Sequence, residues 1–238
     1  MTNIRQSNDG PDVFQRFRPL STAVTRGTMT RRDHSASMEA CSQTSGKTFP
    51  GTSGLRASGK SIVLVGLMGA GKSSVGKRLA RCLNLPFADA DDEIVAVAGC
   101  SIPDIFDIYG EEAFRDCERR VIVRMLKQEP HVMATGGGAF MNAATRSEIR
   151  ERAISVWLRA DLVTLVERTS RRSDRPLLRG DNPRARLESL MRERYPVYAE
   201  ADVVVDTSHE PLEVTVQKVL RALVTARPVR QQPVDGPS

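Results

Sequence analysis

Residues 61–79 read S-I-V-L-V-G-L-M-G-A-G-K-S-S-V-G-K-R-L, and this stretch decides the fold. The apolar, mostly β-branched run at 62–65 is typical of a buried strand. Residues 66–73 fit the pattern G-x-x-x-x-G-K-[ST], and apolar residues then recur at helical spacing. A strand, a glycine loop and a helix in this order form a cradle in which backbone N–H groups and the positive helix N-terminus bind a polyphosphate.

Two side chains at the end of this loop have distinct predicted roles. Lys72 would reach the β- and γ-phosphates of ATP, and the Ser73 hydroxyl would ligate Mg²⁺. The alternative is a glycine turn between strand and helix that binds no ligand.

A second copy of the pattern lies upstream, at residues 54–61. The residues before it, 48–53, are polar and include Pro50, so no strand precedes this copy. The residues after it, 62–65, favour a strand over a helix. We therefore reject the upstream copy as a phosphate-binding loop.

The charge of the chain is unevenly distributed. The 238 residues have a formal net charge of +6. Residues 1–60 carry nine Lys or Arg and four Asp or Glu, whereas the remainder carries 26 and 25. The part after residue 60 therefore lacks the positive excess of a nucleic-acid interface, and we expect no nucleic-acid partner.

The composition also changes near residue 60. Residues 1–59 are rich in Ser, Thr, Gly and Arg without sustained apolar periodicity, which predicts a disordered basic extension. Residues 60–224 alternate strand and helix patterns and form one predicted domain, and 225–238, with three prolines, form a flexible tail. The extension is also compatible with an organelle transit peptide, or with a true start at Met29 or Met38.

Hydropathy and cysteine spacing bear on the compartment. The sequence has no run of about 18 apolar residues, so we expect no membrane span, and it has no apolar segment typical of a secretory signal. Its four cysteines, at 41, 82, 100 and 117, form no C-x-x-C pair and no metal-ligand spacing. Reduced thiols and a cytoplasmic location are the simplest expectation.

Five short apolar segments alternate with helical patterns. The segments lie at 62–65, 85–88, 131–135, 154–158 and 202–207. This predicts an α/β fold, a three-layer α/β/α arrangement in which helices cover both faces of a five-stranded parallel sheet. Among the helices, one begins after Ser101 and ends at Gly110, and a long one follows over 111–128.

Two carboxylates follow the second predicted strand. Asp89 and Asp91 are two residues apart, so in an extended segment they would face the same side of the sheet edge where ligands gather. One could hold Mg²⁺ through water while the other meets an acceptor hydroxyl. The alternative is that Asp91 or Asp92 caps a helix over 93–98.

Two later segments are also candidates. Arg115 flanks the apolar stripe of the long helix, although an ordinary surface pair with Glu111 would explain it equally well. The three consecutive glycines at 136–138 predict a positive φ or close approach of a ligand to the main chain, with a plain turn as the alternative.

The stretch 168–182 contains five arginines and little apolar content. Charge runs of this kind are usually solvated loops. In a phosphate-transfer enzyme such a loop also suits a mobile lid that covers the nucleotide and directs a guanidinium at the γ-phosphoryl group.

Taken in order, these segments resemble the shikimate kinase family, within the nucleoside-monophosphate-kinase-like P-loop folds. The resemblance covers about residues 60–224 and includes G-L-M-G-A-G-K-S-S-V-G at 66–76, D-A-D at 89–91, S-I-P-D-I-F at 101–106, G-E-E-A-F-R at 110–115, G-G-G-A at 136–139, R-P-L-L at 175–178 and R-Y-P-V-Y at 194–198. It implies a P-loop kinase fold with a mobile lid. The implied reaction is ATP-dependent phosphorylation of the 3-hydroxyl of shikimate, a step towards chorismate and the aromatic amino acids.

The resemblance also implies roles for single residues. The ATP phosphates would bind at Gly69, Ala70, Gly71, Lys72, Ser73 and Ser74. Ser73 would ligate Mg²⁺ directly and Asp89 through water. Asp91 would bind the shikimate hydroxyls and is the candidate base.

Further implied contacts come from the second half of the chain. Arg115 and Arg194 would clamp the shikimate carboxylate, because guanidinium forks match carboxylates. Phe106 and Phe114 would form apolar walls of the shikimate site, and the main-chain N–H of Gly137 would contact the substrate. Arg175 would be the catalytic lid arginine, beside Lys72, and Arg168 would contact adenine, together with Pro211 in the loop that reads S-H-E-P at 208–211.

Two other functions fit parts of the pattern. One is a kinase of the same architecture that acts on gluconate or a nucleoside monophosphate. The other is a nucleotide-binding regulatory module that uses the basic extension to reach an acidic partner. The expectation we carry forward is a monomeric enzyme that uses ATP, Mg²⁺ and shikimate, without a membrane partner.

Overall fold

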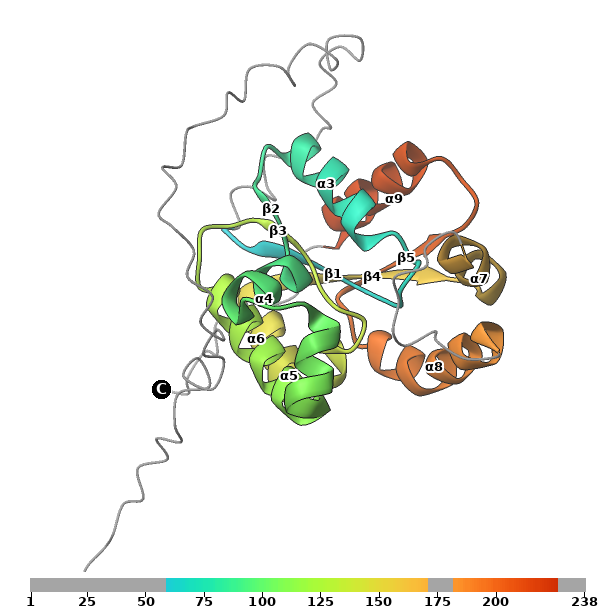
Figure 1. Cartoon of the computed structure of the whole chain (residues 1–238). Coiled ribbons are helices and arrows are strands. Elements are labelled where there is room, and N and C mark those ends of the chain that lie inside the picture. Colours follow the sequence, from blue (N-terminus) through green and yellow to red (C-terminus); the bar gives the residue numbers. More distant parts are fainter. Residues whose placement is uncertain (1–58, 171–181, 227–238) are drawn as a thin grey trace, which may run out of the picture.

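The computed structural model describes residues 59–170 and 182–226 (Figure 1). The predicted basic extension, except Gly59, and nearly all of the predicted C-terminal tail lie outside the described residues. So does most of the arginine-rich stretch, including the proposed lid residue Arg175.

The centre of the molecule is a five-stranded sheet with the strand order β2-β3-β1-β4-β5. Every pair of neighbouring strands is parallel, which confirms the predicted sheet. The strand bounds are Ser61–Val65 for β1, Phe87–Asp89 for β2, Val132–Ala134 for β3, Ala153–Ala160 for β4 and Val203–Thr207 for β5. β1 is central and buried along its whole length, as its continuous apolar run predicts.

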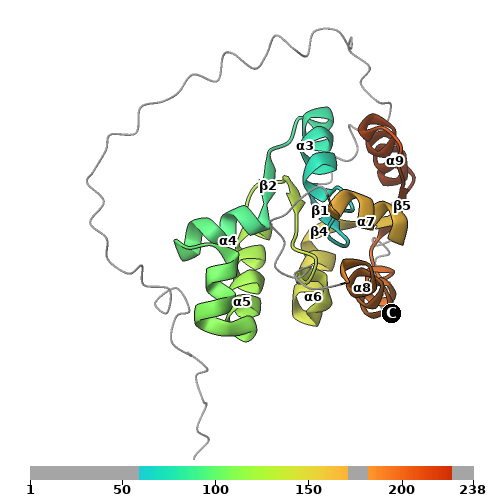
Figure 2. The ribbon, with the colours of Figure 1, turned by 45° about the vertical axis from the view of Figure 1, so that its right-hand side comes forward.

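Helices cover both faces of the sheet. Their bounds are Lys72–Leu83 for α3, Ala90–Ala98 for α4, Ile102–Leu126 for α5, Ala143–Arg152 for α6, Leu162–Ser170 for α7, Pro183–Tyr198 for α8 and Leu212–Thr225 for α9. α3 and α9 lie on one face, and α5, α6 and α8 lie on the other (Figure 1). Figure 2 shows α4 and α5 packed together on the side of the molecule opposite α7, α8 and α9.

The connections from β1 and β3 leave the sheet on opposite faces. The chain runs from β1 through α3 towards β2, whereas it runs from β3 through α6 to β4. In open parallel sheets, ligands bind at the carboxyl ends of the strands beside such a switch point. We therefore expect the active site next to the carboxyl ends of β1 and β3.

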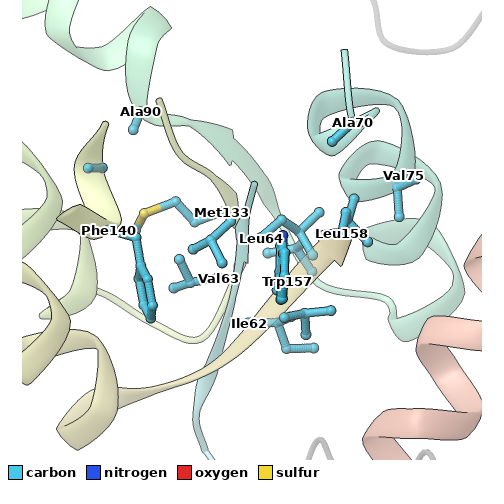
Figure 3. Packing of buried hydrophobic residues seen from close by; sticks show 14 of the residues in the cluster. Ile62, Val63, Leu64, Ala70, Val75, Ala90, Met133, Phe140, Trp157 and Leu158 are labelled. Carbon is cyan, nitrogen blue, oxygen red and sulfur yellow. The ribbon is translucent and has the colours of Figure 1, made fainter. Parts of the chain in front are cut away.

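The core forms on both sides of β1. Val63 lies with Met133 and Phe140 on one side, and Leu64 lies on the other, towards Val75 and Leu158 (Figure 3). All six side chains are buried, and alternate residues of the central strand point to opposite helical layers. This packing fixes β1 and therefore the loop that follows it.

The α5 region confirms a predicted helix break. Ser101 caps the start of α5, as the sequence predicts, and the structure shows that it forms a capping box with Asp104. Gly110 has φ 81° and ψ 172°, so the helical conformation is interrupted there and resumes immediately afterwards. Within 59–170 and 182–226, no helix is both long enough and apolar enough to cross a membrane.

Gly76 provides a test of how closely α3 packs on the sheet. A Cβ at this position would lie 2.5 Å from Cε2 of Phe87 in β2. In a helix, alanine is about 1 kcal/mol more favourable than glycine, but overpacking a buried contact destabilises the fold by about 1–3 kcal/mol. We expect Gly76→Ala to lower the free energy of unfolding by about 1 kcal/mol in urea denaturation. Cys82→Ala, at an exposed position of the same helix, should have no measurable effect, and equal stability of both variants would contradict this packing.

Candidate active site

The glycine loop between β1 and α3 has the geometry of a phosphate cradle. Gly66 has φ 137°, and a Cβ there would lie 2.7 Å from the carbonyl oxygen of Leu158. Gly71, the N-cap of α3, has φ 93° in the left-handed region. Glycine is the residue that tolerates both conditions, and the resulting curl presents backbone N–H groups at the helix N-terminus. The loop therefore fits a polyphosphate.

Lys72 lies across this loop. Its Nζ donates hydrogen bonds to the carbonyl oxygens of Gly66, at 2.8 Å, and Leu67, at 3.0 Å. These contacts hold the ammonium group over the cradle, where a phosphate needs a positive charge.

Ser73 and Asp89 meet at the carboxyl end of β2. The Ser73 hydroxyl donates to Oδ2 of Asp89 at 2.7 Å. Such oxygen donors fit Mg²⁺, which usually combines one or two protein ligands with substrate phosphates and water. No group of three or more His, Cys, Asp or Glu suited to a metal occurs within the described ranges.

The sequence-based account of Asp91 needs a correction. β2 ends at Asp89, and Asp91 lies in the first turn of α4 and not in an extended segment. The N-cap is Asp89, whose Oδ1 accepts from the backbone N–H of Asp91 at 3.2 Å, so the predicted cap at Asp91 or Asp92 is also wrong. The two carboxylates nevertheless line the same cavity, because the cap turns the chain at this point.

A cavity of about 440 Å³ lies beside the glycine loop. This volume is in the range of small-molecule sites. The predicted site residues in its lining are Gly69, Ala70, Gly71, Lys72, Ser73, Ser74, Asp89, Asp91, Gly137 and Arg168. The structure therefore brings the predicted phosphate and metal residues together with Asp91 and Gly137 of the acceptor set. The other predicted acceptor residues are absent from this lining: Phe106, Phe114, Arg115 and Arg194.

Arg168 connects two walls of the nucleotide side. Its Nη1 donates to the carbonyl oxygen of Gly69 at 3.4 Å, and its Nη2 donates to that of Ser208. Pro211 caps α9 and is absent from the cavity lining, although its neighbours Glu210 and Leu212 belong to it. Thr207 and Thr215 also line this wall, and the sequence analysis missed all four of these lining residues.

Arg115 forms two ion pairs, one with the exposed Glu111, as the surface-pair alternative expects, and one with the buried Glu118. Its Nη2 lies 3.2 Å from Oε1 of Glu111, and its Nη1 lies 2.8 Å from Oε2 of Glu118. The guanidinium also lies 5.0 Å from the ring centroid of Phe114, whose ring is 4.5 Å from that of Phe106. The two phenylalanines therefore form one apolar cluster beside Arg115.

Glu118 is a site neighbour that the sequence analysis did not identify. It is 3% exposed, and its Oε1 has no hydrogen-bond partner among the described residues. Burial raises the pKa of Glu118 and the nearby Asp91 raises it further, while Arg115 and Arg194 oppose this change. A signal existed in the sequence, because Glu118 falls on the apolar stripe of α5 between Phe114 and Val121.

The side chains of Arg115 and Arg194 both lie beside the triple glycine. A Cβ at Gly138 would lie 2.2 Å from Nη1 of Arg115. A Cβ at Gly137 would lie 3.5 Å from Nη1 of Arg194. The main chain follows the plain-turn alternative: residues 137–138 form a turn, and none of the three glycines has a positive φ, so the predicted positive φ is wrong.

Arg194 is buried without a full set of partners. It is 7% exposed, and its Nε and Nη1 have no hydrogen-bond partner in the described part of the chain. A buried charge is costly unless it is paired and hydrogen-bonded. Arg194 therefore presents unused donors beside Gly137, in a geometry suited to an anion.

Comparisons with known proteins identify relatives of this chain. The family model described as shikimate kinase matches residues 68–224. A shikimate kinase from Caulobacter vibrioides is 59% identical over 164 residues, which cover 69% of this chain and 82% of that protein. One from Brucella canis is 54% identical with the same coverage.

Solved structures give the same result. A shikimate kinase from Acinetobacter baumannii in complex with shikimate is similar with a TM-score of 0.69 and 36% identity, covering 73% of this chain and 97% of that one. A shikimate kinase from Aquifex aeolicus is similar with a TM-score of 0.58 and 34% identity. The match covers 68% of this chain and 94% of that one. Fold, site geometry and sequence identity agree, and the chain belongs to the shikimate kinase family.

Proposed function

We infer that the chain transfers the γ-phosphoryl group of ATP to the 3-hydroxyl of shikimate, giving shikimate 3-phosphate and ADP. This reaction lies in the pathway to chorismate and the aromatic amino acids. The observation that carries the inference is the buried guanidinium of Arg194, which has unused donors beside Gly137 and close to the phosphate cradle. An acceptor that bears both a carboxylate and a hydroxyl satisfies this arrangement.

On the nucleotide side, residues 69–74 would bind the phosphates of ATP through their backbone N–H groups. Lys72 would contact the β- and γ-phosphates, and Ser73 with Asp89 would hold Mg²⁺. The metal ion would supply positive charge at the transferring phosphoryl group. Arg168 would pack against adenine, with the loop that contains Pro211 on the other side.

On the acceptor side, Arg115 and Arg194 would clamp the carboxylate of shikimate. Gly137 would donate its N–H, and Phe106 with Phe114 would supply the apolar wall. Asp91 would accept the hydrogen bond of the reacting hydroxyl and take its proton as the nucleophile attacks.

Catalysis in this proposal comes mainly from positioning and from charge. Lys72 and the lid residue Arg175 would stabilise the negative charge that spreads over the transferring group. Asp91 would hold the acceptor oxygen in line with that group, which removes most of the entropic cost of bringing the two reactants together.

An acceptor panel tests the proposed function. Purified protein with ATP and Mg²⁺ should release ADP when shikimate is added. Gluconate and nucleoside monophosphates at the same concentration should give no more than the background rate. A faster rate with either of them would identify a different kinase, and no acceptor-dependent ADP with any compound would favour a binding module.

We also propose the remaining features that the sequence predicts. Residues 60–224 form the catalytic domain, between a basic extension at 1–59 and a tail at 225–238. The enzyme is a cytoplasmic monomer that binds neither nucleic acid nor a membrane. Free thiols at Cys82, Cys100 and Cys117 support a reducing compartment, and light scattering on the purified protein measures the oligomeric state.

A further inference from the structure

The triple glycine is tied to α8 by Tyr198. The carbonyl oxygens of Gly136 and Gly138 accept from backbone N–H groups of Ala139 and Met141, within the same turn. The carbonyl oxygen of Gly137 instead accepts a hydrogen bond from the hydroxyl of Tyr198, 61 positions along the chain. The peptide group of Gly137 is therefore held by a hydrogen bond from a distant helix, α8.

The Tyr198 side chain is itself held in place. It is 0% exposed, and its ring lies 5.9 Å from that of Trp157 and 6.4 Å from that of Phe140, measured between centroids. Burial raises the pKa of Tyr198 to about 12, although the charge and a side-chain hydrogen bond of Arg194 oppose this change. The hydroxyl therefore remains protonated and able to donate at neutral pH.

We propose that Tyr198 is a positioning residue for the acceptor site, holding the Gly137 peptide and Arg194 in the geometry that receives the carboxylate-bearing substrate. Glycine has the largest backbone freedom of any residue, so three in a row need an outside contact to present their N–H groups in one direction. α8 supplies this contact one helical turn after Arg194. The proposal rests on the function proposed above and adds a role for Tyr198.

Tyr195 offers a matched control on the same helix. Its hydroxyl also donates to a backbone carbonyl oxygen, that of Ala160, and its ring packs against Trp157 with centroids 4.9 Å apart. Burial raises its pKa to about 12 as well. Its hydroxyl makes no hydrogen bond to the triple glycine within the described residues, and its ring lies 6.3 Å from that of Tyr198 between centroids. Tyr195→Phe therefore removes a comparable hydrogen bond on the same helix and keeps this ring contact.

The test compares Tyr198→Phe with Tyr195→Phe in the full chain. Both variants should lose a similar amount of thermal stability. Tyr198→Phe should raise the KM for shikimate about tenfold while the KM for ATP changes less than about twofold. Tyr195→Phe should leave both constants within about twofold of the parent.

Calorimetric titration with shikimate separates weaker binding from partial unfolding. Unfolded molecules lower the measured stoichiometry, whereas a mispositioned site raises the Kd. Equal KM values for shikimate in the two variants, or a proportional rise in both KM values of Tyr198→Phe, would overturn the role of Tyr198. Failure of the proposed function is a separate result, because the parent protein would then show no shikimate-dependent ADP release.

Discussion

Asp91→Asn is expected to lower kcat about 10²-fold or more, with a much smaller change in the KM for ATP. A general base contributes about 10²–10⁴-fold to a rate, and asparagine has a similar shape but cannot take the proton of the acceptor hydroxyl. Asp91 is placed for this role at the cavity wall, in the first turn of α4. The measurement is steady-state ADP release with shikimate varied at saturating ATP.

Asp92→Asn is the matched control for this experiment. Asp92 is the next residue of the same helical turn, carries the same charge near the helix N-terminus and is exposed. The two variants therefore lose the same interaction with the helix dipole. Asp92→Asn should keep kcat within about twofold. If Asp91→Asn also stays within a few-fold of the parent, Asp91 is not the base.

Arg194→Ala is expected to raise the KM for shikimate about 10²-fold, because truncating one partner of a buried charge pair costs about 2–5 kcal/mol. Its effect on the KM for ATP should be small, since the phosphate cradle is built from α3 and its preceding loop. In a thermal shift assay, ATP with Mg²⁺ should still raise the Tm of the variant. Shikimate should no longer do so.

Arg192→Ala provides the comparison on the same helix. The Arg192 side chain is 78% exposed and pairs with Glu188 on the surface. Such pairs contribute little to stability, so this variant should keep the shikimate response of the parent. A shikimate-dependent Tm increase that survives in Arg194→Ala would exclude Arg194 as the carboxylate anchor.

The sequence was sufficient for the parallel sheet and the phosphate loop because their signals lie within consecutive residues. The apolar run of β1, the glycines of the loop and the spacing of α3 are local, and the structure follows them closely. The structure adds Asn142 and Asn182 as the N-caps of α6 and α8, which are local signals of the same kind. The helical position of Asp91 was not predicted from the sequence, because the chain changes from strand to helix at a single cap residue, Asp89.

The acceptor side depended more on contacts between distant segments. The sequence marked Arg115 and Arg194 only as arginines in a recognisable order. The structure placed Arg115 against the buried Glu118 and Arg194 beside Gly137. It also placed Thr207 in the cavity lining, which no short-range pattern indicates.

The sequence by itself therefore determined the fold class, the phosphate cradle and the family of this protein, because backbone conformation and apolar periodicity are encoded over a few neighbouring residues. Tertiary structure alone decided which charged groups are buried with unsatisfied donors and which main-chain groups accept hydrogen bonds from distant segments. Arg194 and the Tyr198–Gly137 hydrogen bond show the reason. Burial and pairing depend on which distant segments the sheet brings together, and that proximity has no signature in the local sequence.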